Sequence, residues 1–129
     1  MNDRVIVDSS LWIELERGNK DVTQKIVPLL EEDRIDLVDV IIAEVVRGAK
    51  TARKYAELIK AFQAFPILTT DWLEVSELAF RSARSGYQPP LIDLYIAQCA
   101  IDNKRVLITA DRHFAPIRRF SNLKVQIIG

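Results

Sequence analysis

Acidic side chains recur in this 129-residue sequence where short apolar runs give way to helical patterns. Four share this placement, at or just after an expected strand end or near the start of an expected helix: Asp8, Glu44, Asp93 and Asp111. Carboxylates gathered in a partly desolvated pocket repel one another, so such a site either takes up protons or binds a cation. Oxygen ligands suit a hard divalent ion such as Mg2+ or Mn2+, which often keeps water and a phosphate in its coordination shell. These residue types therefore favour metal-assisted hydrolysis of a phosphodiester bond.

Other catalytic chemistries lack the residues that they need. The sequence has one histidine, His113, and one cysteine, Cys99, so a zinc site built from cysteine and histidine cannot form. A glycine-rich phosphate loop of the Walker type is also missing from the sequence. His113 follows Asp111 by two residues, and we interpret it as a polar residue at a helix start in preference to a general base.

Hydroxyl side chains accompany two of the acids. Ser9 and Ser10 follow Asp8 directly, and Thr109 precedes Asp111 by two positions. Such hydroxyls can orient a metal-bound water, or they can serve as helix caps and as hydrogen-bonding groups at a strand end. For the two serines we prefer these structural roles, as helix caps and strand-end hydrogen-bonding groups.

The elements that must position these side chains are clearest over residues 90–114. Helical spacing of apolar residues predicts a helix over 90–103, whose first turn carries Asp93. A short aliphatic run then predicts a buried parallel strand over 106–109, and Asp111 follows it. Ligands of open α/β sheets bind at the carboxyl edge of the strands. We therefore expect both acids at that edge.

The same order of strand, acid and helix occurs at the start of the chain. The apolar run 5–7 ends in Asp8, and a helical pattern continues to Gly18. As an alternative, Asp8 only caps this helix. Glu44 lies in the next expected helix that follows a strand, and its alternative is a solvated acid paired with Arg47.

The remaining pattern alternates between strands and helices. Strands are expected over 35–38, 66–68 and 125–128, and helices over 21–32, 40–47, 49–65, 71–85 and 114–120. This alternation predicts a small α/β domain over residues 1–129, with a mostly parallel sheet and helices on both of its faces.

Composition and charge are those expected of one soluble domain. Hydrophobic residues make up 49% of the chain, enough for a single core. The 18 basic and 18 acidic residues cancel, so nucleic-acid binding would need a local basic patch. The sequence has neither an apolar run of about 20 residues nor a signal-peptide core in MNDRVIVD, so we expect an unexported protein without a membrane span. Cys99 is expected to be a reduced core thiol, which suits the cytoplasm.

A local basic patch occurs at the start of the helix expected over 49–65. Lys50, Arg53 and Lys54 lie there, a few residues after Glu44. Such a group is usually a solvated helix face. The alternative is contact with phosphate groups next to the acidic site.

Four motifs together resemble a known family. In chain order they are V-I-V-D-S-S, I-I-A-E-V-V-R-G, D-L-Y-I-A-Q and L-I-T-A-D-R-H-F, and their order and spacing resemble those of PIN-domain ribonucleases. In this size class the chain resembles VapC-type toxins of type II toxin–antitoxin systems. The resemblance covers nearly the whole chain. It implies a PIN-like three-layer α/β/α fold, RNA as the substrate, a homodimer, and a VapB-type antitoxin whose tail covers the acidic pocket.

The resemblance also implies roles for individual residues. Metal-binding acids fall on Asp8, Glu44, Asp93 and Asp111, with Asp8 and Asp93 as direct ligands of Mg2+, and Thr109 falls on a hydroxyl position near the metal. The predicted reaction is metal-dependent endonucleolytic hydrolysis of RNA, in which Glu44 completes the metal shell or helps to deprotonate the attacking water. The candidates for substrate binding are Thr109 beside the metal and, for contact with the RNA backbone, Arg47, Lys50, Arg53 and Arg112. Many relatives carry another acid at the position of His113, so a second metal ion is less expected here.

Two other classes of protein stay open at this stage. A receiver-like phosphoacceptor domain also places acids at strand ends around Mg2+, but it needs a paired acid near the first strand, where Ser9 and Ser10 follow Asp8. A non-catalytic PIN-like module would use its acids only to bind a basic partner tail. Loss of nuclease activity in an Asp8→Ala variant would exclude both.

Overall fold

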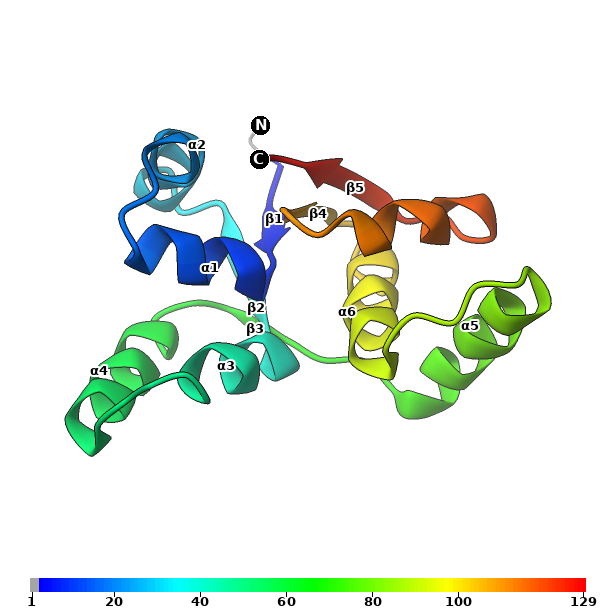
Figure 1. The fold of residues 1–129 in the computed structure, drawn as a ribbon, viewed down its shortest axis with the longest axis horizontal. Helices are drawn as coiled ribbons and strands as arrows, with labels where there is room; N and C mark the ends of the chain where they lie inside the picture. The colour runs from blue at the N-terminus through cyan, green and yellow to red at the C-terminus, as the bar shows by residue number, and fades with distance from the viewer. Residues whose placement is uncertain (1–2) are drawn as a thin grey trace.

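The computed structural model of the protein describes residues 3–129 and has five parallel strands at its centre (Figure 1). The strands are β1 (Val5–Val7), β2 (Ile35–Val38), β3 (Ile67–Leu68), β4 (Val106–Thr109) and β5 (Lys124–Ile127). Their order across the sheet is β3-β2-β1-β4-β5, and every pairing is parallel. The sheet was expected to be mostly parallel, and within the described residues it is wholly parallel.

Helices cover both faces of this sheet, which gives the predicted three-layer α/β/α fold. They are α1 (Ser9–Glu16), α2 (Lys20–Glu31), α3 (Asp39–Val46), α4 (Ala52–Phe62), α5 (Trp72–Arg84), α6 (Leu91–Asp102) and the 3-10 helix η1 (Arg112–Arg119). Helices α1 and α2 lie on one side of β1, and α6 lies on the other (Figure 1). Within residues 3–129, none of the helices combines the length and apolar character needed to cross a membrane.

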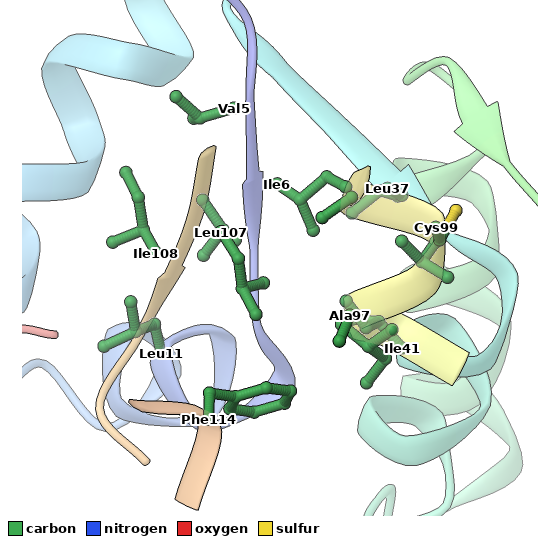
Figure 2. Packing of buried hydrophobic residues seen from close by; sticks show 14 of the residues in the cluster. Val5, Ile6, Leu11, Leu37, Ile41, Ala97, Cys99, Leu107, Ile108 and Phe114 are labelled. Carbon is green, nitrogen blue, oxygen red and sulfur yellow. The ribbon is translucent and has the colours of Figure 1, made fainter. Parts of the chain in front are cut away.

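The core explains why the strands are continuous apolar runs. Val5 and Ile108 point towards α1 and α2, whereas Ile6 points towards α6, where Ala97 and Cys99 lie (Figure 2). All five side chains are buried. Successive residues of a strand point to opposite faces, so a strand that is covered on both sides is apolar at most of its positions, and a polar side chain there needs a partner. The free thiol of Cys99 is part of this core, as predicted.

Most element boundaries match the predictions closely, and one helix is clearly shorter. Helix α6 and strand β4 lie within a residue of the ranges predicted for them. The helix predicted over 49–65 is wrong at both ends, because α4 covers only Ala52–Phe62. Its start is determined by Thr51, whose side-chain oxygen accepts a hydrogen bond from the Lys54 backbone N–H at 3.0 Å.

A buried ion cluster ties the three central strands together. Asp36 of β2 is 1% exposed, and its two carboxylate oxygens accept hydrogen bonds from Arg4 Nε at 2.7 Å and from Arg105 Nε at 2.8 Å. Arg4 precedes β1 and Arg105 precedes β4, so the cluster lies at the amino ends of the strands. This cluster could not be predicted from the sequence, because an acid inside an apolar run does not reveal which distant residues will neutralise it.

Candidate active site

The opposite, carboxyl edge of the sheet brings four acidic side chains together from four elements. Asp8 follows β1 and Asp111 follows β4, whereas Asp93 lies in the first turn of α6 and Glu44 lies in α3. Helix α6 leads back to the start of β4, so its own first turn lies near the ends of the strands. The pKa of Asp93 is raised by the charges of all three other acids. The structure therefore joins the four predicted residues into one electrostatically connected group.

Asp8 is buried, with 4% of its surface exposed. Its Oδ2 atom accepts hydrogen bonds from Thr109 Oγ1 at 2.8 Å and from Ser10 Oγ at 3.0 Å. Burial raises the pKa of Asp8 above its usual value, and repulsion from Asp111 raises it further. The hydrogen bonds from Thr109 and Ser10 oppose this rise. Both side-chain donors reach Oδ2, so among the described residues no side chain donates to Oδ1.

Of the two structural roles that we preferred for the serines, helix capping is wrong, whereas hydrogen bonding at the strand end is found for Ser10. Asp8 itself occupies the N-cap position of α1, and its side chain makes no capping hydrogen bond. Ser10 donates to Asp8, and Ser9 Oγ donates to Glu44 Oε1 at 3.2 Å. Both hydroxyls therefore hold acids of the site. The alternative in which Asp8 serves only as a helix cap does not agree with these contacts.

Glu44 is half-buried and faces Asp8. Burial raises the pKa of Glu44, and the charge of Asp8 adds to the effect. The hydrogen bond from Ser9 and the positive charge of Arg47 act in the opposite direction. Among the described residues Arg47 forms no ion pair with Glu44, so the solvated acid paired with Arg47 is not what the structure shows.

Asp93 is the acid least stabilised by its surroundings. Within residues 3–129 its carboxylate accepts no hydrogen bond from another side chain or from a distant backbone group. Its pKa is raised to about 6, first by burial and then by repulsion from Asp111, Asp8 and Glu44, while His113 lowers it. A half-buried carboxylate among three others, without a compensating donor, is a position that a cation would stabilise.

Asp111 is held by its neighbours on both sides. Its backbone N–H donates to Thr109 Oγ1 at 2.9 Å, and its Oδ1 accepts the His113 backbone N–H at 2.8 Å. The His113 ring Nδ1 also lies 2.7 Å from Oδ1. His113 is thus the helix-start residue that we expected, and it orients Asp111. Thr109 is fully buried, so its hydroxyl orients Asp8 and Asp111 instead of meeting a substrate.

The donor set fits a hard divalent cation in its chemistry. Each acid keeps at least one carboxylate oxygen to which no side chain donates among the described residues, and the neighbouring groups are hydroxyls instead of thiols. Within residues 3–129, however, no three acidic, histidine or cysteine side chains lie close enough together to hold a metal ion jointly. A cation here would therefore be bound by one or two carboxylates directly and by the others through water, and Asp93 is the acid with the fewest hydrogen bonds to restrain it.

The four basic candidates are all exposed, but they differ in their surroundings. Arg47 is near Glu44, and Arg112 adjoins Asp111. Lys50 lies in the connection between α3 and α4. Arg53 is already engaged, since its Nε lies 3.4 Å from Glu57 one helical turn away. Of the four, Arg53 is the one with an ion pair among the described residues, and its side chain stays 91% exposed.

Tyr87 is a residue at this site that the sequence analysis missed. It precedes α6 by a few residues, and its hydroxyl donates a hydrogen bond to the backbone oxygen of His113. Burial raises the pKa of Tyr87, and the charges of Asp111 and Asp93 raise it further. Its position ahead of two prolines identifies a turn, but no local pattern could have indicated a contact with a residue 26 positions later.

Comparison with known proteins identifies relatives of this fold. A protein-family model described as PIN domain matches residues 5–119. No curated protein sequence gives a significant match. Among solved structures, a chain of VapBC2 from Rickettsia felis, bound to a DNA fragment from its promoter, superposes with a TM-score of 0.77 at 16% sequence identity. The match covers 97% of this chain and 98% of that one.

Two further solved structures are similar to the chain. VapBC-5 from Mycobacterium tuberculosis, of the VapBC family of toxin–antitoxin systems, is 22% identical with a TM-score of 0.70, over 98% of this chain and 100% of that one. FitAcB from Neisseria gonorrhoeae is 18% identical with a TM-score of 0.72, over 94% of this chain and 95% of that one. At such identities the likeness establishes the shared fold.

Proposed function

The chain belongs to the PIN domain family, and from that premise we propose that it is a metal-dependent endoribonuclease, the toxin of a type II toxin–antitoxin pair. One observation carries the proposal. Four carboxylates from four elements converge at the carboxyl edge of the sheet, and Asp93 has a pKa raised to about 6 by burial and by the other three acids. Members of this fold family act as nucleases. The four acids lie at the carboxyl ends of the strands, which is where α/β sheets bind their ligands.

The proposed roles follow from the contacts of each side chain. Asp8, Asp93 and Asp111 hold Mg2+ or Mn2+, directly or through water, and Glu44 completes the shell or takes a proton from the attacking water. When bound, the metal supplies charge stabilisation for the phosphoryl oxygens and a more acidic water. The chain's hydroxyls restrict the ligands: Ser10 and Thr109 both donate to Oδ2 of Asp8, and Ser9 holds Glu44 beside it.

Substrate binding is assigned to the exposed basic side chains. Arg47 and Arg112 lie next to acids of the site, and Lys50 lies on the connection that follows α3. We propose that they contact RNA phosphates on either side of the scissile bond. Arg53 contributes less because it is paired with Glu57. Such contacts supply affinity and salt dependence without sequence specificity.

The partners are proposed from the relatives. VapBC and FitAB complexes share this fold, so we propose that a VapB-type antitoxin covers the acidic pocket of this chain with a basic tail. We also propose a homodimer that acts in the cytoplasm. A basic side chain inserted among these carboxylates would lower the pKa of Asp93 and replace the cation.

Cleavage of a mixed RNA pool tests the proposal. The purified chain is incubated with Mg2+ or Mn2+, with EDTA, and as the Asp93→Ala variant, and the new 5′ ends are mapped. Site-specific cuts that disappear with EDTA and in Asp93→Ala support the proposal, and a Glu77→Gln variant, changed at an exposed acid of α5, serves as the control. If the folded protein binds the metal but cuts no RNA, the chain is instead a PIN-like binding module.

A further inference from the structure

Tyr87 connects three elements around the acidic group. It lies between α5 and α6, in a segment that runs on the same side of the molecule as η1 (Figure 1). Its hydroxyl donates a hydrogen bond to the backbone oxygen of His113, the second residue of η1. The side chain thus joins the connection that leads into the first turn of α6, where Asp93 lies, to the turn that carries Asp111.

The backbone of Tyr87 is held by a buried serine. The Tyr87 backbone N–H donates to the backbone oxygen of Ser82 at 3.0 Å, and Ser82 Oγ donates to the Tyr87 backbone oxygen. Ser82 is 1% exposed, although serine is usually a surface residue. Every polar group of Tyr87 therefore has a defined partner, and its ring and hydroxyl are directed towards η1 by the end of α5.

Hydrogen bonds continue from Tyr87 into the acidic group. His113, whose carbonyl receives the Tyr87 hydroxyl, donates its own backbone N–H to Asp111 Oδ1. Asp111 in turn donates its N–H to Thr109 Oγ1, and the same hydroxyl donates to Asp8 Oδ2. An unbroken series of contacts thus runs from buried Ser82 on α5 to Asp8 after β1.

The surroundings of the acids show why this restraint matters. Asp111 is only partly buried, with 34% of its side chain exposed, and the His113 side chain is 73% exposed. An exposed imidazole restrains a neighbouring carboxylate weakly, because water competes for the same hydrogen bonds. The bond from Tyr87 restrains the carbonyl of His113, the residue whose N–H donates to Asp111.

From these contacts we propose that Tyr87 is a positioning residue of the active site, which holds the Asp111 turn in register with the start of α6. This inference rests on the proposed function for its catalytic meaning. Tyr87 touches neither the metal nor the substrate in this role. It acts through His113 and Asp111. The distance between Asp93 and Asp111 is thereby pre-organised in the metal-free protein.

Two measurements on folded protein test the inference. The variants are Tyr87→Phe, which removes only the hydroxyl, and Tyr95→Phe as the matched control. Tyr95 lies on α6, and its hydroxyl donates to Asp39 and accepts from the Thr70 N–H, so it bonds neither to the four acids nor to His113. Backbone hydrogen exchange of Asp111 and His113 is followed without metal, and Mn2+ affinity is measured by electron paramagnetic resonance.

Tyr87→Phe is expected to speed exchange at both amides and to weaken Mn2+ binding by about two- to tenfold, as the loss of one hydrogen bond allows. Tyr95→Phe is expected to leave both values at those of the unchanged protein, with exchange measured under conditions in which these amides exchange by local opening. Unchanged exchange at Asp111 and His113 in Tyr87→Phe overturns the inference. Absence of Mn2+ binding by the unchanged protein would refute the proposed function instead, and the exchange result would still decide the positioning role.

Discussion

Replacing Asp93 with asparagine should stabilise the metal-free protein at neutral pH. The pKa of Asp93 is about 6 in the folded chain, against 3.8 for an unperturbed aspartate. Between these values the folded state binds more protons than the unfolded state, so the free energy of unfolding falls as pH rises. The stability is fully present below pH 3.8 and is lost as pH rises through about 6. Asparagine is neutral at every pH and avoids this loss.

The size of the effect follows from the two pKa values. At about 1.36 kcal/mol for each pKa unit, the difference between 3.8 and about 6 corresponds to about 3 kcal/mol. Asp93 is only half-buried, so solvent screening reduces this figure. We expect Asp93→Asn to raise the free energy of unfolding by about 1–2 kcal/mol above about pH 7 and to change it little near about pH 4.

Urea unfolding followed by circular dichroism, in EDTA and at several pH values, measures this difference. Glu77→Gln is the control, because Glu77 is an exposed acid on the neighbouring helix. A difference between Asp93→Asn and the unchanged protein that does not vary with pH would refute the electrostatic reasoning. Added Mg2+ should remove the advantage of the variant, since the cation binds only the folded state and stabilises the chain that keeps all four acids.

Three further predictions concern other contacts of the site and the core. Thr109→Val should cost about 1–3 kcal/mol in urea unfolding, because it removes a donor to Asp8 and leaves the Asp111 N–H without its acceptor, whereas Thr109→Ser should retain most of the stability. A cost no larger than that of Thr109→Ser would contradict this account. Asp36→Ala should lower the free energy of unfolding by about 3 kcal/mol or more, because it leaves Arg4 and Arg105 beside a buried apolar site, but it should not change Mn2+ affinity in protein that stays folded. Lys50→Ala and Arg112→Ala should each weaken RNA binding and reduce the magnitude of the salt-dependence slope by about 1 in filter-binding titrations, while Arg53→Ala should change it less because of its pairing with Glu57. Equal slopes for all three variants would show that the pairing of Arg53 does not matter.

The strands and the acids that follow them could be predicted from the order of neighbouring residues in the sequence. Val5–Val7 and residues 106–108 are continuous apolar runs because helices cover both of their faces, and each run is followed by an acid within three residues. Strand direction and right-handed connections then determine that the ends of these strands meet at one edge. The residues of the candidate site were therefore predictable without knowledge of their distances.

Interactions between distant residues were not predictable in the same way. The serines after Asp8 have the composition of helix caps, and only the fold shows that Ser9 donates to Glu44, 35 positions away. In the sequence, Asp36 is a charged residue inside an apolar strand. Only the fold shows that Arg4 and Arg105 neutralise it. The sequence by itself determined which elements form and which acids follow them, because propensity, hydrophobic period and connection rules act over neighbouring residues. Tertiary structure alone decided which donors hold each acid and how far its pKa rises, because burial and charge depend on residues that only folding brings close.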